Sequence, residues 1–109
     1  MSEAALRARL AGEGLTASSW SNGPFDHYAE HRHDYDKVLV AAAGSITFHL
    51  PELGRDVLLG RGDRLDLPAN TLHGADVGAD GVICLEAHRW AGSLSPEPEH
   101  IPGWGANDS

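Results

Sequence analysis

Beyond its first residues, this chain shows no helical periodicity, and short strand-like runs alternate instead with turn signals. Its 109 residues include 13 glycines and six prolines, which divide the chain at close and regular intervals. About eight short strands with this spacing are typical of a β-sandwich or a β-barrel. We therefore predict an all-β protein with strands over residues 16–20, 25–33, 37–42, 45–50, 56–59, 64–67, 71–77 and 81–90.

The two ends of the chain differ from this pattern. Ser2 can cap a short helix from Glu3 to about Leu10, because alanine and leucine favour helix and an acidic first turn suits the helix dipole. The segment from Ala91 onward is polar and rich in proline, so we expect it to wrap the surface or to be partly disordered. The length predicts a single domain over 1–109, with its core at about 15–90 and a polar tail at 91–109.

The composition argues against several partners. Eight basic and sixteen acidic residues give a net charge of −8, whereas binding to nucleic acid rests on basic patches. No apolar run approaches the roughly 20 residues of a membrane-spanning helix, and the first residues lack a signal-peptide pattern. We expect neither nucleic acid nor membrane as a partner. Cys84 is the only cysteine, so a reducing, cytoplasmic location is the simplest expectation.

Two of the seven histidines stand in a His-x-His pair, His31-Arg32-His33. On a strand, both imidazoles would point to one face and Arg32 to the other, which is half of a metal site. Such a pair alone is more often a solvated strand face, so a third ligand is needed to favour a metal.

A second pattern supplies a third histidine. The turn residue Gly62 begins a short strand, Pro68-Ala69-Asn70 ends it, and His73 opens the next strand. Asparagine is among the best substitutes for glycine where a positive φ is required. A hairpin of this shape can bring His73 back across a barrel toward the His-x-His pair.

These two patterns, in this order and with strands between them, resemble the two motifs of the cupin superfamily. The first reads from His31 to Gly44, the second ends at His73, and together they span roughly residues 23–77. The resemblance implies a small cupin-like β-barrel (a double-stranded β-helix or jelly roll) that holds one divalent transition metal through His31, His33 and His73. The residues do not choose among zinc, nickel, iron, copper and manganese.

The chain departs from the motifs at several positions. Phe25 stands at the place of a glycine, although Gly23 is near, and Val77 stands at the place of an asparagine; neither position is a ligand in the family. Lys37 stands at the position of the metal-binding glutamate, and a charged ammonium group cannot ligate. The site would therefore consist of three neutral histidines with open positions for water or substrate. Asp34 and Asp36 are possible replacement carboxylates, although residues on a tight turn are more often solvated.

Three interpretations of Lys37 stay open. In the first, it points inward and anchors the carboxylate or another anionic group of a substrate. In the second, it is a base whose pKa is lowered by burial and by a nearby cation. In the third, a shift of register after the preceding turn directs it to solvent, where it pairs with an acid.

Other residues are candidates for the same cavity. His27 shares the strand parity of the His-x-His pair, so it lines the cavity unless a bulge intervenes. Cys84, Glu86 and His88 alternate on one face of the last strand, and that face can border the cavity. We expect Cys84 to be a buried core residue.

These residues support two main hypotheses of function. The first is a small metal-binding cupin that acts as a metalloenzyme, such as a dioxygenase, isomerase or lyase, on a small anionic molecule. The alternative is a non-catalytic module that binds or senses a small ligand; a storage or structural dimer with a vestigial site is a third possibility. No obvious acid–base pair stands beside the histidines, which slightly favours binding.

We also expect a homodimer. A small barrel has sheet edges to cover, and cupin-like chains commonly pair through an outer sheet or a swapped N-terminal strand. The segment from Leu15 to Trp20 should then lie near the interface.

Overall fold

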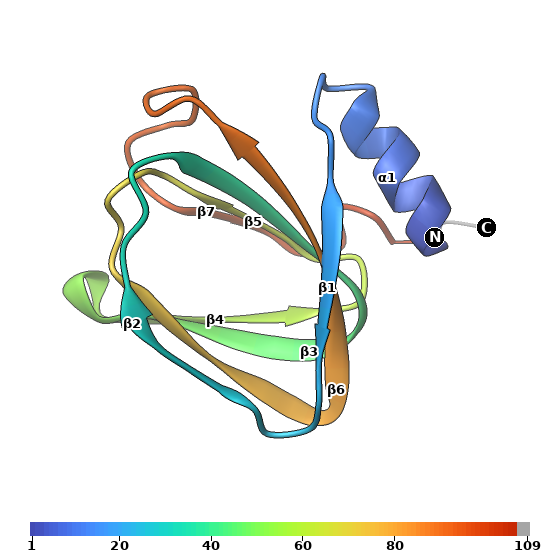
Figure 1. Cartoon of the computed structure of the whole chain (residues 1–109), viewed down its shortest axis with the longest axis horizontal. Helices are drawn as coiled ribbons and strands as arrows, with labels where there is room; N and C mark the ends of the chain where they lie inside the picture. Colours follow the sequence, from blue (N-terminus) through green and yellow to red (C-terminus); the bar gives the residue numbers. More distant parts are fainter. Residues whose placement is uncertain (107–109) are drawn as a thin grey trace.

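Seven strands and one α-helix make up the fold in Figure 1, a computed structural model that describes residues 1–106. All strand pairs are antiparallel, and the predicted all-β fold with a short N-terminal helix is confirmed. The elements are α1 (Glu3–Ala11), β1 (Ser18–Asn22), β2 (His27–His31), β3 (Asp36–Leu50), the 3₁₀ turn η1 (Pro51–Leu53), β4 (Arg55–Gly60), β5 (Arg64–Leu67), β6 (His73–Arg89) and β7 (Glu99–Ile101).

The two longest strands, β3 and β6, pair with each other and build both layers of the barrel. In one layer, the first half of β3 and the second half of β6 are flanked by β1 on one side and by β5 and β7 on the other. In the other layer, the remaining halves are flanked by β2 and β4. Figure 1 shows the strands arranged around a common interior. Each long strand replaces two shorter strands predicted from the sequence.

The long strands bend where glycines let their backbones approach. The register between β3 and β6 shifts between Ala41 and Ala43 and again between Gly44 and Ile46. Gly44 and Gly81 both have a positive φ, and a Cβ on Gly44 would collide with the carbonyl oxygen of Gly81. Glycine is therefore required at this bend. The turn signal at Gly44 marks a bend within one strand rather than the end of a strand.

Apolar side chains lie on both faces of the layer that holds β1 and β5. The face between the layers carries the main core, which includes Leu39 and Ala41 of β3. The opposite face carries Val38 and Val40, and α1 covers it with Leu6. This packing explains how so short a helix is stable, because isolated helices of this length are marginal in water. Other members of this outer cluster are Leu10, Leu15, Ala42, Leu85 and Ala87.

The C-terminal segment does more than wrap the surface. β7 pairs with β5, so the tail adds a strand to the sheet. Trp104 packs against the outer cluster, with the guanidinium groups of Arg9 and Arg64 at 4.6 Å and 5.0 Å from its ring. The backbone N–H of Gly105 donates to the carbonyl oxygen of Gly62 at 2.7 Å. Within residues 1–106, no helix is long and apolar enough to cross a membrane.

Candidate metal centre

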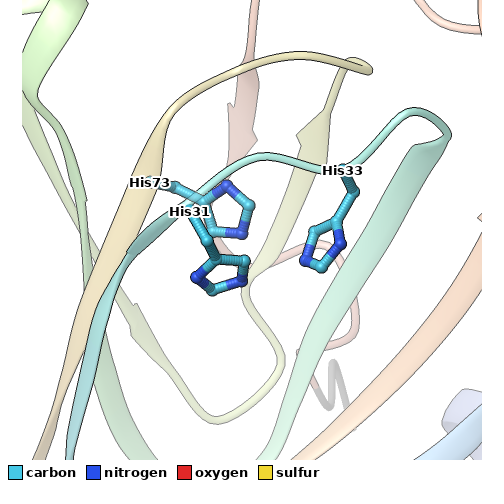
Figure 2. A group of neighbouring side chains, drawn as sticks. All are labelled: His31, His33 and His73. Atoms are coloured by element: carbon cyan, nitrogen blue, oxygen red, sulfur yellow. The ribbon is translucent and has the colours of Figure 1, made fainter.

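Three histidines come together in a cavity of about 280 Å³ inside the barrel (Figure 2). His31 and His73 are direct partners in the β2–β6 pair, and His33 comes from the segment between β2 and β3. One nitrogen atom of each imidazole lies within 4.8 Å of the other two. The structure thus brings together the three residues that the sequence predicts as ligands.

Hydrogen bonds set the orientation of two of these rings. Nδ1 of His31 lies 2.8 Å from the carbonyl oxygen of Ala29, and Nδ1 of His73 lies 2.8 Å from that of Thr71. A carbonyl oxygen only accepts, so each Nδ1 carries a proton and each neutral ring keeps a lone pair on Nε2. Nε2 of His33 is buried and has no hydrogen-bond partner among the described residues. Three Nε2 atoms are therefore free to ligate, which fits a metal ion.

Burial also favours the form of histidine that binds a metal. Desolvation lowers the pKa of His73 to about 4. The hydrogen bond to Thr71 raises this pKa, whereas positive charge on His31, Lys37 and His33 lowers it further. Desolvation and the charge of Lys37 likewise lower the pKa of His33. Both imidazoles are therefore neutral at pH 7, as a ligand must be.

A turn on the neighbouring loop holds His33 in place. β2 ends at His31, earlier than predicted, yet His33 still faces the cavity. The backbone N–H of Asn70 donates to the carbonyl oxygen of His33 at 2.7 Å, and Asn70 has the positive φ expected for its place in the motif. Arg32 points away from the cavity and donates to both carboxylate oxygens of Glu52, at 2.7 Å and 2.8 Å.

Lys37 points into the same cavity. Its Nζ lies 3.3 Å from Oε1 of Glu86, and only 10% and 16% of the two side chains are exposed. Lys37 faces His88 across the β3–β6 pair, and Leu39 faces Glu86, so Lys37 and Glu86 project from one face of the sheet. The interpretation that directs Lys37 to solvent is therefore wrong.

Glu86 contacts three side chains at the cavity, and the sequence did not predict these contacts. Its Oε1 also accepts from Nε1 of Trp20 at 3.1 Å, and its Oε2 lies 2.6 Å from Nε2 of His88. Burial raises the pKa of Glu86, but His88, Lys37 and Trp20 together outweigh burial and hold this pKa below its ordinary value. Glu86 is therefore ionised at pH 7. In the sequence, the alternation of Cys84, Glu86 and His88 is the pattern that indicated the cavity-facing side of β6. Cys84 is buried in the core, as predicted.

His27 does not reach the cavity, so its prediction as a cavity residue is wrong. The register of β2 against β6 shifts between Tyr28 and His31, and Tyr28 takes the inward position. The side chain of His27 is 64% exposed, and its Nδ1 lies 2.7 Å from Oδ1 of Asp76. Asp76 also contacts Nε2 of His49 at 2.7 Å, on the outer side of the same strands.

Neither replacement carboxylate joins the histidines. Asp36 is buried, and its two carboxylate oxygens accept from the backbone N–H groups of Ala69 and Leu94, both at 2.8 Å. It therefore ties the loop after β5 and the C-terminal segment to the start of β3. Asp34 is exposed, and no carboxylate within residues 1–106 belongs to the histidine group.

The fold and the cavity define this chain as a small antiparallel barrel whose three inward histidines could hold a metal ion. Comparison with solved structures identifies the fold as the cupin barrel, which confirms the resemblance of the two motifs to the cupin superfamily. No protein-family model matches the chain, and no curated protein matches it.

Three of the similar structures show how far this likeness extends. A chain from the crystal structures of the DMSP lyases RdDddP and RnDddQII is 26% identical, with a TM-score of 0.64 over 78% of this chain and 43% of that chain. KdgF from Halomonas sp. is 22% identical, with a TM-score of 0.58 over 68% of each chain. The oxalate decarboxylase of Bacillus subtilis, which has Mn(II) centres, is 21% identical, with a TM-score of 0.59 over 81% of this chain and 24% of that chain. This chain thus spans less than half of the DMSP lyase chain and about a quarter of the decarboxylase chain.

Proposed function

We propose that this protein is a small metal-binding cupin that holds one divalent transition metal through His31, His33 and His73. The observation that carries the proposal is the convergence of three imidazoles whose Nε2 atoms are free. Imidazole ligands suit zinc, nickel, iron and copper, and the residues do not distinguish these metals from manganese. The Mn(II) centres of the Bacillus subtilis oxalate decarboxylase support a divalent metal in this fold.

The ligand that we propose is a small anionic molecule. Lys37 and Glu86 neutralise each other, and the three imidazoles are uncharged as ligands. The two charges of the metal are therefore uncompensated, which favours an anion in the open positions. A cavity of about 280 Å³ lies just below the usual range of small-molecule sites, which favours a small ligand.

We further propose that the protein is a metalloenzyme rather than a binding or sensing module. The absence of an obvious acid–base pair beside the histidines slightly favoured the binding alternative, whereas Lys37 and Glu86 lie together in the cavity. A DMSP lyase and an oxalate decarboxylase among the similar structures are enzymes by name. When bound, a divalent ion supplies Lewis-acid polarisation of a coordinated oxygen atom.

The protein's own residues would orient and shield the bound molecule. Lys37 presents N–H donors toward the cavity, and Glu86 holds the ammonium group in place. The rings of Trp20 and Tyr28, 5.7 Å apart, line the cavity with Phe48 and limit the access of water.

We also propose that the protein is a cytoplasmic homodimer. Within residues 1–106, β1 has β6 as its single strand partner, so its other edge is open for pairing with a second copy. This agrees with an interface near residues 15–20. The unpaired, buried thiol of Cys84 is compatible with a reducing compartment.

The metal proposal is tested by elemental mass spectrometry of protein purified without a histidine tag. We expect close to one divalent metal per chain in the wild type and a strong loss in His73→Ala, because two remaining imidazoles hold the ion poorly. The matched control is His27→Ala, which removes an exposed imidazole outside the cavity and should retain the metal. Equal metal content in wild type and His73→Ala would overturn the assignment of the site.

A further inference from the structure

A continuous row of polar contacts leads from the cavity to the solvent. It begins at Nζ of Lys37, passes through Glu86 and ends at the imidazole of His88. Lys37 and Glu86 are almost buried, whereas 51% of the His88 side chain is exposed. The row therefore joins a buried ammonium group to a histidine that is half exposed to water.

The two oxygens of Glu86 divide the contacts between them. Oε1 faces Lys37 at 3.3 Å, and Oε2 faces Nε2 of His88 at 2.6 Å. A carboxylate in this position can take a proton on the oxygen that faces His88 and, after the carboxyl group turns, release it to Lys37. The N–H of Trp20 donates to Oε1 at 3.1 Å, which sets the resting orientation of the ionised carboxylate.

We propose that Lys37 is the acid–base residue of the cavity and that Glu86 and His88 carry its proton to and from solvent; the catalytic part rests on the proposed metalloenzyme. When Lys37 acts as an acid, an Nζ–H bond breaks, the proton passes to the bound molecule, and the electron pair stays on nitrogen. To restore Lys37, Nδ1 of His88 takes a proton from water while the proton on its Nε2 moves to Oε2 of Glu86, so the imidazole stays neutral. The carboxyl group then turns to bring the protonated oxygen to Lys37, the proton passes to Nζ, and Glu86 is again a carboxylate; the reverse order makes Lys37 a base.

Other titratable groups around Lys37 belong to the metal site or to its walls. His73 faces the cavity from β6, Tyr28 and His31 face it from β2, and His33 and Tyr35 face it from the segment that follows. The ring of Tyr35 packs on the ring of His88 with 4.2 Å between centroids. Neither Tyr35 nor His88 needs to change position when the proton passes between Lys37 and solvent.

The test uses a property of the sequence, because Lys37 is the only lysine. In protein labelled with ¹⁵N-lysine, one Nζ signal reports the exchange of the ammonium hydrogens with water by nuclear magnetic resonance. We expect His88→Gln to slow this exchange by about tenfold or more at neutral pH, since a positioned proton carrier is lost. The Nζ chemical shift of His88→Gln should equal that of the wild type, because Glu86 remains beside Lys37.

Two further variants complete the experiment. His27→Gln makes the same change at an exposed histidine that is also paired with a carboxylate, and its exchange rate should match the wild type. Glu86→Gln should move the Nζ signal, because the ion pair is lost. Exchange in His88→Gln that is as fast as in the wild type, or an Nζ signal that Glu86→Gln leaves in place, would overturn the proton path.

The metal content of the same samples separates this inference from the proposed function. A wild type without metal contradicts the metalloenzyme, while the measured exchange rates still decide the proton path. Conversely, unchanged exchange in His88→Gln beside a fully loaded wild type overturns the path and leaves the metal site standing.

Discussion

At the scale of single residues, the site depends on both local spacing and contacts across strands. His31, His33 and His73 follow from two short patterns, because the pleat and the turn residues determine where such side chains point. The pairing of Lys37 with Glu86 joins residues far apart in the sequence, so no local pattern shows it. His27 failed as a candidate because one shift of register reverses which side chains face inward.

Replacing the lysine of the cavity tests its effect on the metal. Lys37→Glu removes a cation and places a carboxylate at the ligand position of the motif, so metal affinity should rise by about tenfold, or ~1.4 kcal/mol. Lys37→Met removes only the charge and should raise affinity less. Competition with a chelator measures both variants, and an affinity equal to that of the wild type in Lys37→Glu would contradict the inward placement of this side chain.

At the scale of elements, the sequence predicts where strands lie better than where they end. β5 has the predicted bounds, because Gly62 and Pro68 enclose it. The bend at Gly44 was interpreted as a turn, since a glycine with positive φ serves either role. The contribution of β7 was missed because three residues among prolines carry no strand signal of their own. Its pairing with β5 comes from the tertiary structure.

A substitution that adds one methyl group to Gly105 tests the packing of the C-terminal segment against α1. A Cβ on Gly105 would collide with Cδ2 of Leu6, which is fully buried and has no room to move. We expect Gly105→Ala to lower the free energy of unfolding by about 1–3 kcal/mol, as overpacking typically does. Urea denaturation measures this change. Gly23→Ala is the matched control, because a Cβ there meets its nearest neighbour at 3.8 Å; equal stabilities of the two variants would contradict this docking.

At the scale of the whole molecule, helix α1 and the C-terminal segment already cover one outer face of the barrel. That face is therefore occupied within a single chain, and the edge of β1 is the surface that we propose for pairing with a second copy. The spacing of the motifs predicted the cupin barrel. It did not predict that α1 and the C-terminal segment cover this outer face, because that depends on contacts between apolar residues far apart in the sequence.

Light scattering tests the proposed dimer. We expect a mass of twice the 11.6 kDa of one chain at micromolar concentration. Each chain carries a net charge of −8, so added salt should increase the dimer fraction by screening the repulsion between copies. A monomer under both salt conditions would contradict the dimer.

The position of Lys37 has a practical consequence for measuring the stability of this protein. A protease that cleaves only after lysine has one bond to cut in the whole sequence. That bond lies in β3, where the strand pairs with β5 on one side and β6 on the other. Cleavage requires β3 to leave both partners, so its rate follows the population of opened molecules. The rate at which the intact chain is converted into two fragments, measured by gel electrophoresis, would thus report the opening of the barrel.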